Sequence, residues 1–201
     1  DTVDKAIHEE FININQLEGK NILLRNVIRQ LINRILESEK LHVPFRILQL
    51  EKDVSSLFPL HENMHVKLKG IIDRVDEKGE VIRIIDYKTG KIGKKRPASL
   101  DEYFSDPAFK EQFQAMYYAY LTRSKMPGKQ IKSGLFAMRN MSEGIWFLNN
   151  DQPFTQDQFN EFEILLNKLL TEIFSPETPF IQTIDIDRCE YCAYKSVCNR
   201  D

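Results

Sequence analysis

The sequence lacks several features that would place it in a class at once. No apolar run approaches the roughly 20 residues that a helix needs to cross a bilayer. The printed residues contain no secretory signal, no internal repeat and no low-complexity tract. The three cysteines are an odd number and all lie between residues 189 and 198, which argues against a secreted disulfide framework. We therefore expect a cytoplasmic protein that does not engage a membrane.

A strong positive charge is also absent. The 28 Lys and Arg residues are offset by 30 Asp and Glu residues, which leaves a net charge of −2 and a pI of about 6.2. A protein with this balance can bind nucleic acid only through a local basic patch. One such run follows residue 87 and consists of Lys88, Lys91, Lys94, Lys95 and Arg96. A solvated loop is the alternative interpretation of this run.

Length and patterning predict one domain over residues 1–201, with 42% apolar residues to form its core. Apolar spacing predicts helices over residues 3–17, 21–40, 107–124 and 155–174, and strands over 45–50, 64–75, 80–87, 131–138 and 144–148. Residues 53–62 and 91–106 are expected to be loops, and 140–143 a hairpin turn. This order fits an α/β or α+β fold in which helices flank a mixed central sheet.

Three local features refine this prediction. Thr155 is the expected N-cap of the last helix, and Pro107 suits the first turn of the preceding one. The second helix is expected to bury one face, made of Leu24, Val27, Ile28, Leu31, Ile35 and Leu36. Because the chain starts at Asp1 without a methionine, directly in a helical pattern, we expect it to be a fragment of a larger protein.

The stretch from Gly70 to Gly90 carries most of the functional information. Its two apolar runs flank a polar turn at 77–80, and each carries or ends in an acid, Asp73 and Asp86. Lys88 follows Asp86 by two positions, so on a strand the two side chains point to the same face. A hairpin would bring Asp73 beside Asp86. An isolated Asp86–Lys88 ion pair at a strand end is the alternative interpretation.

Two carboxylates at close range repel each other unless a cation lies between them. Mg²⁺ prefers oxygen ligands and is typically held by one or two carboxylates together with substrate phosphate. Asp73, Asp86 and the backbone carbonyl of Tyr87 would make such a site for Mg²⁺ or Mn²⁺. The ion can lower the pKa of a bound water and polarise a phosphoryl oxygen. Lys88 can orient the nucleophile or neutralise charge on the phosphate, so the trio predicts phosphodiester cleavage.

These residues resemble the core of the RecB-like branch of the PD-(D/E)XK nucleases, which have a restriction-endonuclease-like fold. The family pattern is a histidine on an early helix, a G-x-x-D strand, a D/E-x-K strand and a helix with Q-x-x-x-Y. The matching residues are, in order, His8, Asp73, Asp86 with Lys88, and Gln114 with Tyr118. The glycine that usually precedes the histidine is missing. The resemblance covers about residues 3–200.

The resemblance implies a role for each matching residue. His8 would be a third metal ligand, and Lys88 would be catalytic with the two acids and Gln114. Gln114 and Tyr118 would line the site and touch substrate or the lysine. Without the resemblance, His8 is more simply a surface histidine, and Gln114 and Tyr118 are residues at the edge of the core. Glu51, just after the predicted strand at 45–50, is a further candidate near the site.

The cysteines of the tail, residues 185–201, suggest a metal cluster. The spacing Cys189-x2-Cys192-x5-Cys198 suits a zinc site completed by a histidine, or three free thiols. It also resembles the triplet that holds a 4Fe–4S cluster in several RecB-like nucleases, whose fourth cysteine lies upstream of the histidine helix. No upstream cysteine exists here. The resemblance therefore implies a structural cluster in the full-length protein, absent or damaged in this chain.

Taken with the residues, the resemblance implies a Mg²⁺- or Mn²⁺-dependent DNA exonuclease of repair and recombination, from an AddB-type helicase–nuclease. Its partners would be single-stranded DNA, contacted by Tyr118 and the basic run at 91–96, and a helicase domain or subunit. One alternative is a non-catalytic relative that holds DNA or a partner protein. Another is a cysteine-ligated metal module whose sheet is only a scaffold.

Overall fold

The structure is a computed structural model that describes residues 2–10, 19–179, 181–190 and 192–200. Its helices are α1 (Thr2–Glu10), α2 (Lys20–Lys40), α3 (Glu102–Ser105), α4 (Lys110–Arg123) and α5 (Gln156–Phe174), with 3-10 turns η1 (Pro107–Phe109), η2 (Met138–Glu143), η3 (Asn149–Asp151) and η4 (Ile186–Cys189). Its strands are β1 (Arg46–His61), β2 (Met64–Lys78), β3 (Val81–Lys88), β4 (Gln130–Ala137) and β5 (Ile145–Phe147). The expected mixed α+β fold is confirmed.

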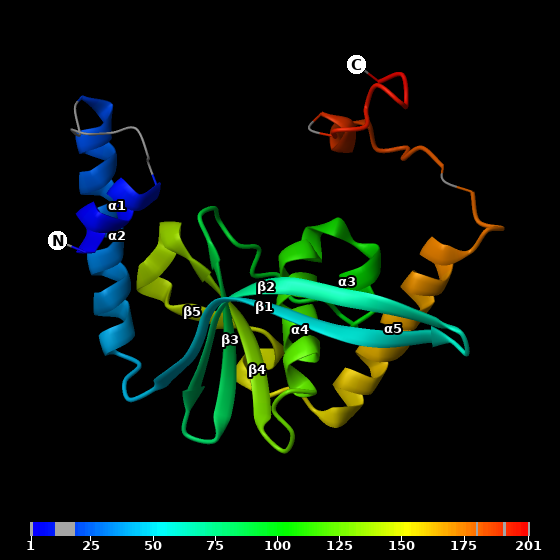
Figure 1. Cartoon of the computed structure of the whole chain (residues 1–201), viewed down its shortest axis with the longest axis horizontal. Coiled ribbons are helices and arrows are strands. Elements are labelled where there is room, and N and C mark those ends of the chain that lie inside the picture. The colour runs from blue at the N-terminus through cyan, green and yellow to red at the C-terminus, as the bar shows by residue number, and fades with distance from the viewer. Residues whose placement is uncertain (1, 11–18, 180, 191, 201) are drawn as a thin grey trace.

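One five-stranded sheet, in the order β1-β2-β3-β4-β5, organises the molecule. Neighbouring strands are antiparallel except β3 and β4, which run parallel. A parallel pair needs a crossover connection, and here the crossover contains α3 and α4. In Figure 1, α1 and α2 lie on one side of the sheet, and α3, α4 and α5 lie on the other.

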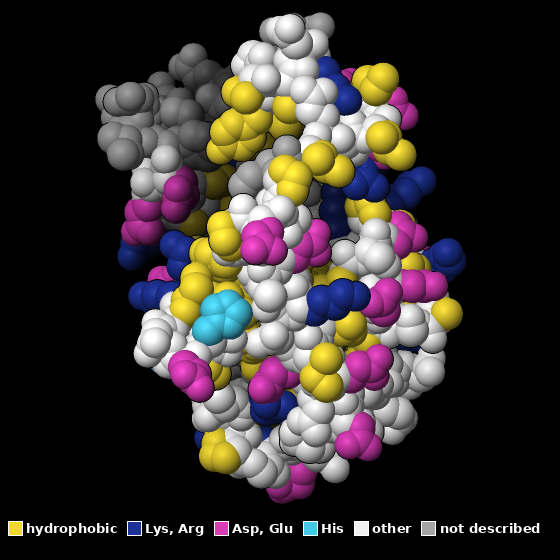
Figure 2. Space-filling view, turned by 90° about the vertical axis from the view of Figure 1, so that its right-hand side faces the viewer, with side chains coloured by type: hydrophobic (Ala, Val, Ile, Leu, Met, Phe, Trp, Pro, Cys, Tyr) yellow, Lys and Arg dark blue, Asp and Glu magenta, His cyan; other side chains and the backbone are white. Residues whose placement is uncertain are grey.

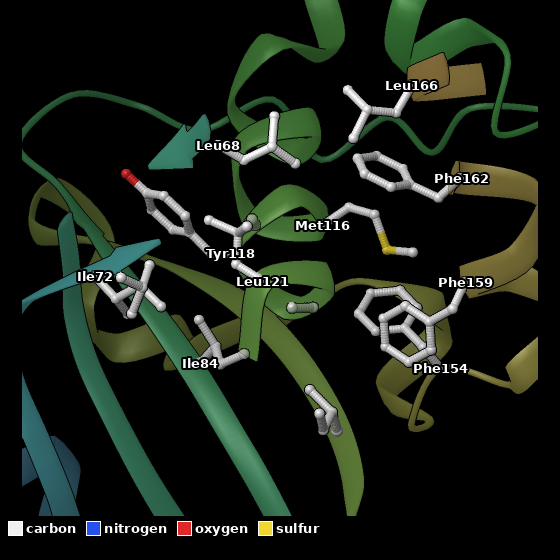
Figure 3. Packing of buried hydrophobic residues seen from close by; sticks show 14 of the residues in the cluster. Leu68, Ile72, Ile84, Met116, Tyr118, Leu121, Phe154, Phe159, Phe162 and Leu166 are labelled. Carbon is white, nitrogen blue, oxygen red and sulfur yellow. The ribbon is translucent and has the colours of Figure 1, made fainter. Parts of the chain in front are cut away.

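The main core fills the space between the sheet, α4 and α5. Figure 3 shows α4 between the two layers, with Ile72 and Ile84 of the sheet on one side and Phe162 of α5 on the other. A smaller cluster of Ile85, Phe136 and Met141 lies on the opposite sheet face, where α2 packs. Alternation along β3 thus sends Ile84 to α4 and Ile85 to α2. Within the described residues, no helix is long and apolar enough to cross a membrane.

The predicted loop at 53–62 is wrong, because β1 continues to His61. Val54, Phe58 and Leu60 are buried in the main core, and the segment pairs with β2 from Val54↔Gly70 to Phe58↔Val66. The resulting β1–β2 hairpin extends across α4 towards α5 (Figure 1). Exposed Ser55 and Leu57 between the buried positions obscure the strand in the sequence.

The prediction for α2 is correct in extent and partly wrong in burial. Leu31 and Ile35 pack against the smaller cluster, whereas Leu24, Val27 and Leu36 are exposed. The helix lies against the sheet only along its later turns, so the apolar stripe is wider than the contact that it makes. Part of the predicted first helix, residues 11–17, lies outside the described residues.

Other local predictions have clear outcomes. Thr155 caps α5 in a capping box, in which its hydroxyl accepts from the Gln158 amide and the Gln158 side chain accepts from the Thr155 amide. Pro107 starts η1, which leads into α4. The predicted loop at 91–106 contains the short helix α3, and the turn at 140–143 is part of η2.

Candidate active site

Asp73 and Asp86 are brought together where the β2–β3 ladder ends. The last pair of that ladder is Arg74↔Ile85, so Asp73 and Asp86 occupy the next position on each strand. The amide of Tyr87 donates a hydrogen bond of 2.7 Å to Oδ2 of Asp73. One oxygen of Asp73 is therefore fixed by the backbone of β3, beside the strand that carries Asp86.

The Tyr87 peptide is itself held from the opposite face of the sheet. The ring of Tyr87 packs edge-on against Phe136, and its hydroxyl accepts a 3.0 Å hydrogen bond from Arg74. Arg74 is buried and also binds Glu39 of α2 and Asp76 of β2. A buried ionic network on one face thus fixes the peptide that positions Asp73.

Asp86 and Lys88 point to the same face of β3, as their spacing predicts. The Nζ atom of Lys88 lies 2.6 Å from Oδ2 of Asp86, in an ion pair rather than an aligned hydrogen bond. The side chain of Asp86 is 4% exposed and that of Lys88 is 20% exposed. The acid is therefore buried, and the lysine side chain is partly exposed.

Burial raises the pKa of the Asp86 carboxyl above its usual range. The Lys88 ammonium opposes this shift, whereas the negative charges of Asp73 and Glu111 add to it. Glu111, in the first turn of α4, was not anticipated as part of the site. Its position three residues before Gln114, on one helical face, was the available signal. The negative charges of Asp73 and Glu111 therefore both act on the Asp86 carboxyl.

Lys88 is oriented by α4 as well as by Asp86. Its Nζ atom donates a 2.7 Å hydrogen bond to Oε1 of Gln114, and Nε2 of Gln114 donates a 3.0 Å bond to the hydroxyl of Tyr118. The ring of Tyr118 lies against Gly70 of β2, where an added Cβ would stand 2.6 Å from ring atom Cε1. Gly70 is therefore needed for the close approach of α4 to the sheet.

The two other residues that the sequence suggests for the site, His8 and Glu51, are exposed. His8 is exposed on α1, and no group of three or more His, Cys, Asp or Glu side chains in the part of the chain that the structure describes is arranged to hold a metal. The structure therefore does not assemble the expected trio of His8, Asp73 and Asp86. Glu51 is exposed, with φ 44°, and lies on β1 between residues that pair with Arg74 and Ile72, across from Asp73.

The basic loop at 91–96 begins just beyond Lys88 and is anchored at several points. Gln112 of α4 donates to the carbonyl oxygens of Gly93 and Lys95 at 3.2 and 2.9 Å. Lys94 pairs with Glu143 of η2. Arg96 lies 4.7 Å above the ring of Trp146 on β5. The loop, with exposed Lys91 at its start, therefore runs in a defined path from the acidic group to the edge strand.

On the α5 side of the molecule, acidic and basic side chains are intermixed, as Figure 2 shows.

The cysteine tail leaves the end of α5, and the two termini lie on opposite sides of the molecule (Figure 1). Cys189 is buried, Cys192 and Cys198 are half-buried, and all three are free thiols. Arg200 donates to the Cys189 sulfur at 3.3 Å. The predicted iron–sulfur role of these residues stays a prediction.

Comparison with known proteins agrees with this arrangement. A family model described as the PD-(D/E)XK nuclease superfamily matches residues 3–199. The match spans the sheet, α4 and the tail. No curated protein matches the chain.

Proposed function

Because the chain belongs to the PD-(D/E)XK nuclease superfamily, we propose that it hydrolyses phosphodiester bonds of DNA in an active site formed by Asp73, Asp86 and Lys88. One observation supports this more than any other. Two acids from adjacent strands meet at the end of a ladder, and an ammonium lies 2.6 Å from the buried one. A nuclease needs such a group to bring a cation and a phosphate together.

The acids suit a divalent metal such as Mg²⁺ or Mn²⁺. Such ions prefer oxygen ligands, and Asp73 and Asp86 offer carboxylates, with the carbonyl of Tyr87 as a further donor. The charges of Asp73 and Glu111 disfavour ionised Asp86, and a cation bound between the acids would relieve this repulsion. When bound, the metal would supply Lewis-acid polarisation of the phosphoryl group and increase the acidity of the attacking water. His8 remains a predicted ligand.

The protein groups have separate tasks in this proposal. Lys88 stabilises the negative charge that grows on the phosphate as water attacks phosphorus and the bond to the leaving oxygen breaks. Gln114 and Tyr118 are positioning residues, because they hold the ammonium from α4. Tyr118 is also a predicted DNA contact. The loop cations Lys91, Lys94, Lys95 and Arg96 contact phosphates beside the reacting one, which requires no base readout.

We further propose that the substrate is single-stranded DNA degraded from an end, in repair or recombination, beside a helicase domain or subunit. The support is the likeness of the four motif pieces to the RecB-like branch. Linear and circular single strands, labelled at one position, should be incubated with Mn²⁺. Linear DNA should disappear and circular DNA should persist; cleavage of the circle would contradict the exonuclease assignment.

Two variants make the test specific. Asp86→Asn should abolish Mn²⁺-dependent degradation, because it removes a carboxylate from the acidic group. Glu80→Gln is the matched control, since the Glu80 side chain is 90% exposed at the β2–β3 turn. Equal degradation by wild type and Asp86→Asn would refute the proposed function.

A second candidate is a non-catalytic relative that holds DNA through the same fold. It is favoured by the direct pairing of Asp86 with Lys88 and by the lack of a three-ligand group among the described residues. In that case DNA would bind without metal, and no Mn²⁺-dependent products would form with wild type.

A further inference from the structure

A basic cavity of about 430 Å³ opens on the sheet face opposite α4. It lies where β3 and β4 begin, beside β5, and Arg83 and Lys132 are paired across those two strands. Arg83 is three residues from Asp86, so the two side chains project from opposite faces of β3. The cavity is therefore separate from the acidic group.

Cations dominate the cavity wall. Lys78, Arg83, Arg96 and Lys132 line it, and among the described lining residues one is acidic: Asp151, which is 67% exposed and pairs with Lys132 at 2.6 Å. His42 completes the polar lining. Among the described residues, Asp151 pairs with Lys132 and Asp76 with Arg83, so Lys78 and Arg96 are the lining cations without an acidic partner. A wall of this composition attracts an anion.

Aromatic rings hold two of these cations in place. The guanidinium of Arg96 lies 4.7 Å from the centre of the Trp146 ring, and Nζ of Lys132 lies 4.1 Å from the centre of the Phe147 ring. Both rings belong to β5 and line the cavity. Contacts between cations and ring faces are attractive, so the positive groups are pre-organised without a full set of acidic partners.

Arg83 gives an independent sign of a ligand. It is 3% exposed and lines the cavity, and its Nη2 atom has no hydrogen-bond partner among the described residues. Its Nε atom binds Asp76, but Asp76 is shared with Arg74. Buried donors are normally satisfied, and a guanidinium presents a planar fork of donors suited to phosphate oxygens. Because Nη2 is itself buried, a phosphate in the cavity would supply the missing acceptor after a small displacement of the Arg83 side chain.

We infer that this cavity binds a phosphate group of the nucleic acid strand, several nucleotides from the bond that is cleaved. The inference rests on the proposed function for the identity of the ligand. The basic loop at 91–96 connects the two places, because it begins beyond Lys88 and ends at Arg96 in the cavity wall. Five residues of β3 separate Arg83 from Lys88, which corresponds to roughly 17 Å along the strand. A strand must therefore exceed a few nucleotides to occupy both.

Lys78→Gln/Lys132→Gln is the variant that tests this cavity. Lys78 is exposed, and within the part of the chain that the structure describes the ionic partner of Lys132 is exposed Asp151, so neither substitution breaks the buried network. Lys125→Gln/Lys168→Gln is the matched control, because it removes the same charge from positions outside the cavity. Arg83 is left intact, since its pairing with Asp76 supports the fold.

Binding should be measured by fluorescence anisotropy in EDTA, with labelled single strands of about 4 and about 20 nucleotides. The cavity variant should bind the longer strand several-fold more weakly than the control does. The slope of log affinity against log salt should become shallower by about 0.7 for each phosphate that the variant no longer neutralises. The shorter strand should lose less affinity than the longer one, because it cannot occupy the cavity and the site beside Lys88 at the same time.

Equal affinity of both variants for the longer strand would overturn the inference, and so would equal losses for both lengths. Calorimetric titration with inorganic phosphate separates a free anion from a strand. If phosphate binds the cavity and the longer strand is unaffected by the variant, the nucleic acid assignment is overturned. The binding assay contains EDTA, so it does not depend on cleavage. A failure of the cleavage test would leave its outcomes unchanged, and the two proposals can therefore be refuted separately.

Discussion

The contact between Gly70 and Tyr118 offers a sharp test of how the site is built. In Gly70→Ala, the new Cβ would stand 2.6 Å from Cε1 of Tyr118, and the ring must withdraw by about 0.8 Å to reach an ordinary contact of 3.4 Å. Tyr118 is buried in the main core and cannot swing into solvent. The substitution should therefore push α4 away from β2.

The expected cost follows from these contacts. Overpacking of a core costs about 1–3 kcal/mol, and alanine in place of glycine returns about 0.4–1 kcal/mol by restricting the unfolded chain. The melting temperature should fall by roughly 2–4 °C for each kcal/mol that remains. Since Tyr118 holds Gln114 and Gln114 holds Lys88, a shift near 1 Å should also reduce cleavage by up to about 100-fold.

The assay is a double-mutant cycle with thermal unfolding and single-turnover cleavage as readouts. Tyr118→Leu removes the ring atoms that clash, so Gly70→Ala should cost little stability in that background. Gly93→Ala is the control, because nothing lies within 4 Å of its added Cβ. An equal loss of stability from Gly70→Ala in both backgrounds would refute the steric explanation.

Three further predictions concern the charges of the site. Lys88→Met should lower single-turnover cleavage by about 10²–10³-fold, as loss of one preorganised donor does; unchanged cleavage would remove Lys88 from the mechanism. Burial raises the pKa of Asp86 in the folded protein, so the folded state holds this proton more tightly than the unfolded state does. The metal-free protein should therefore lose stability as the pH rises from about 4, the pKa of an aspartate in the unfolded chain, through the pKa of Asp86 in the folded protein. Asp86→Asn should therefore melt higher than wild type at neutral pH without metal, and the gap should close in acid; a lower neutral melting temperature would contradict this sign. Arg74→Met leaves Glu39 buried without its partner and Asp76 with Arg83 alone, and it should cost about 3–5 kcal/mol in urea unfolding, whereas a cost below 1 kcal/mol would show that the network is dispensable.

The hairpin that carries the acids was predictable from local pattern. Each acid directly follows a buried isoleucine, and the turn between the strands is short and polar, so the register that aligns Asp73 with Asp86 needs no distant partner. The end of α5 was similarly readable, because the Thr155 capping box acts within four residues. Such features depend on neighbours in sequence.

Features that depend on distant partners were missed. From the sequence alone, charged side chains such as Arg74, Asp76 and Arg83 are expected at the surface. All three are buried, because Glu39 of α2 and the neighbouring strand supply counter-charges. The second half of β1 is recognisable only through its pairing with β2. The motif correctly grouped Gln114 with Lys88, but it gave no information on the distance between α1 and the sheet, and therefore none on the position of His8.

The central claim is that Asp73 and Asp86 bind a divalent cation next to Lys88. Calorimetric titration of Mn²⁺ into the purified protein tests it most directly. Saturable binding is expected for wild type and for the control Glu172→Gln/Glu177→Gln, which removes two exposed acids, and no binding is expected for Asp73→Asn/Asp86→Asn. Wild-type affinity in the Asp73→Asn/Asp86→Asn protein would contradict the account.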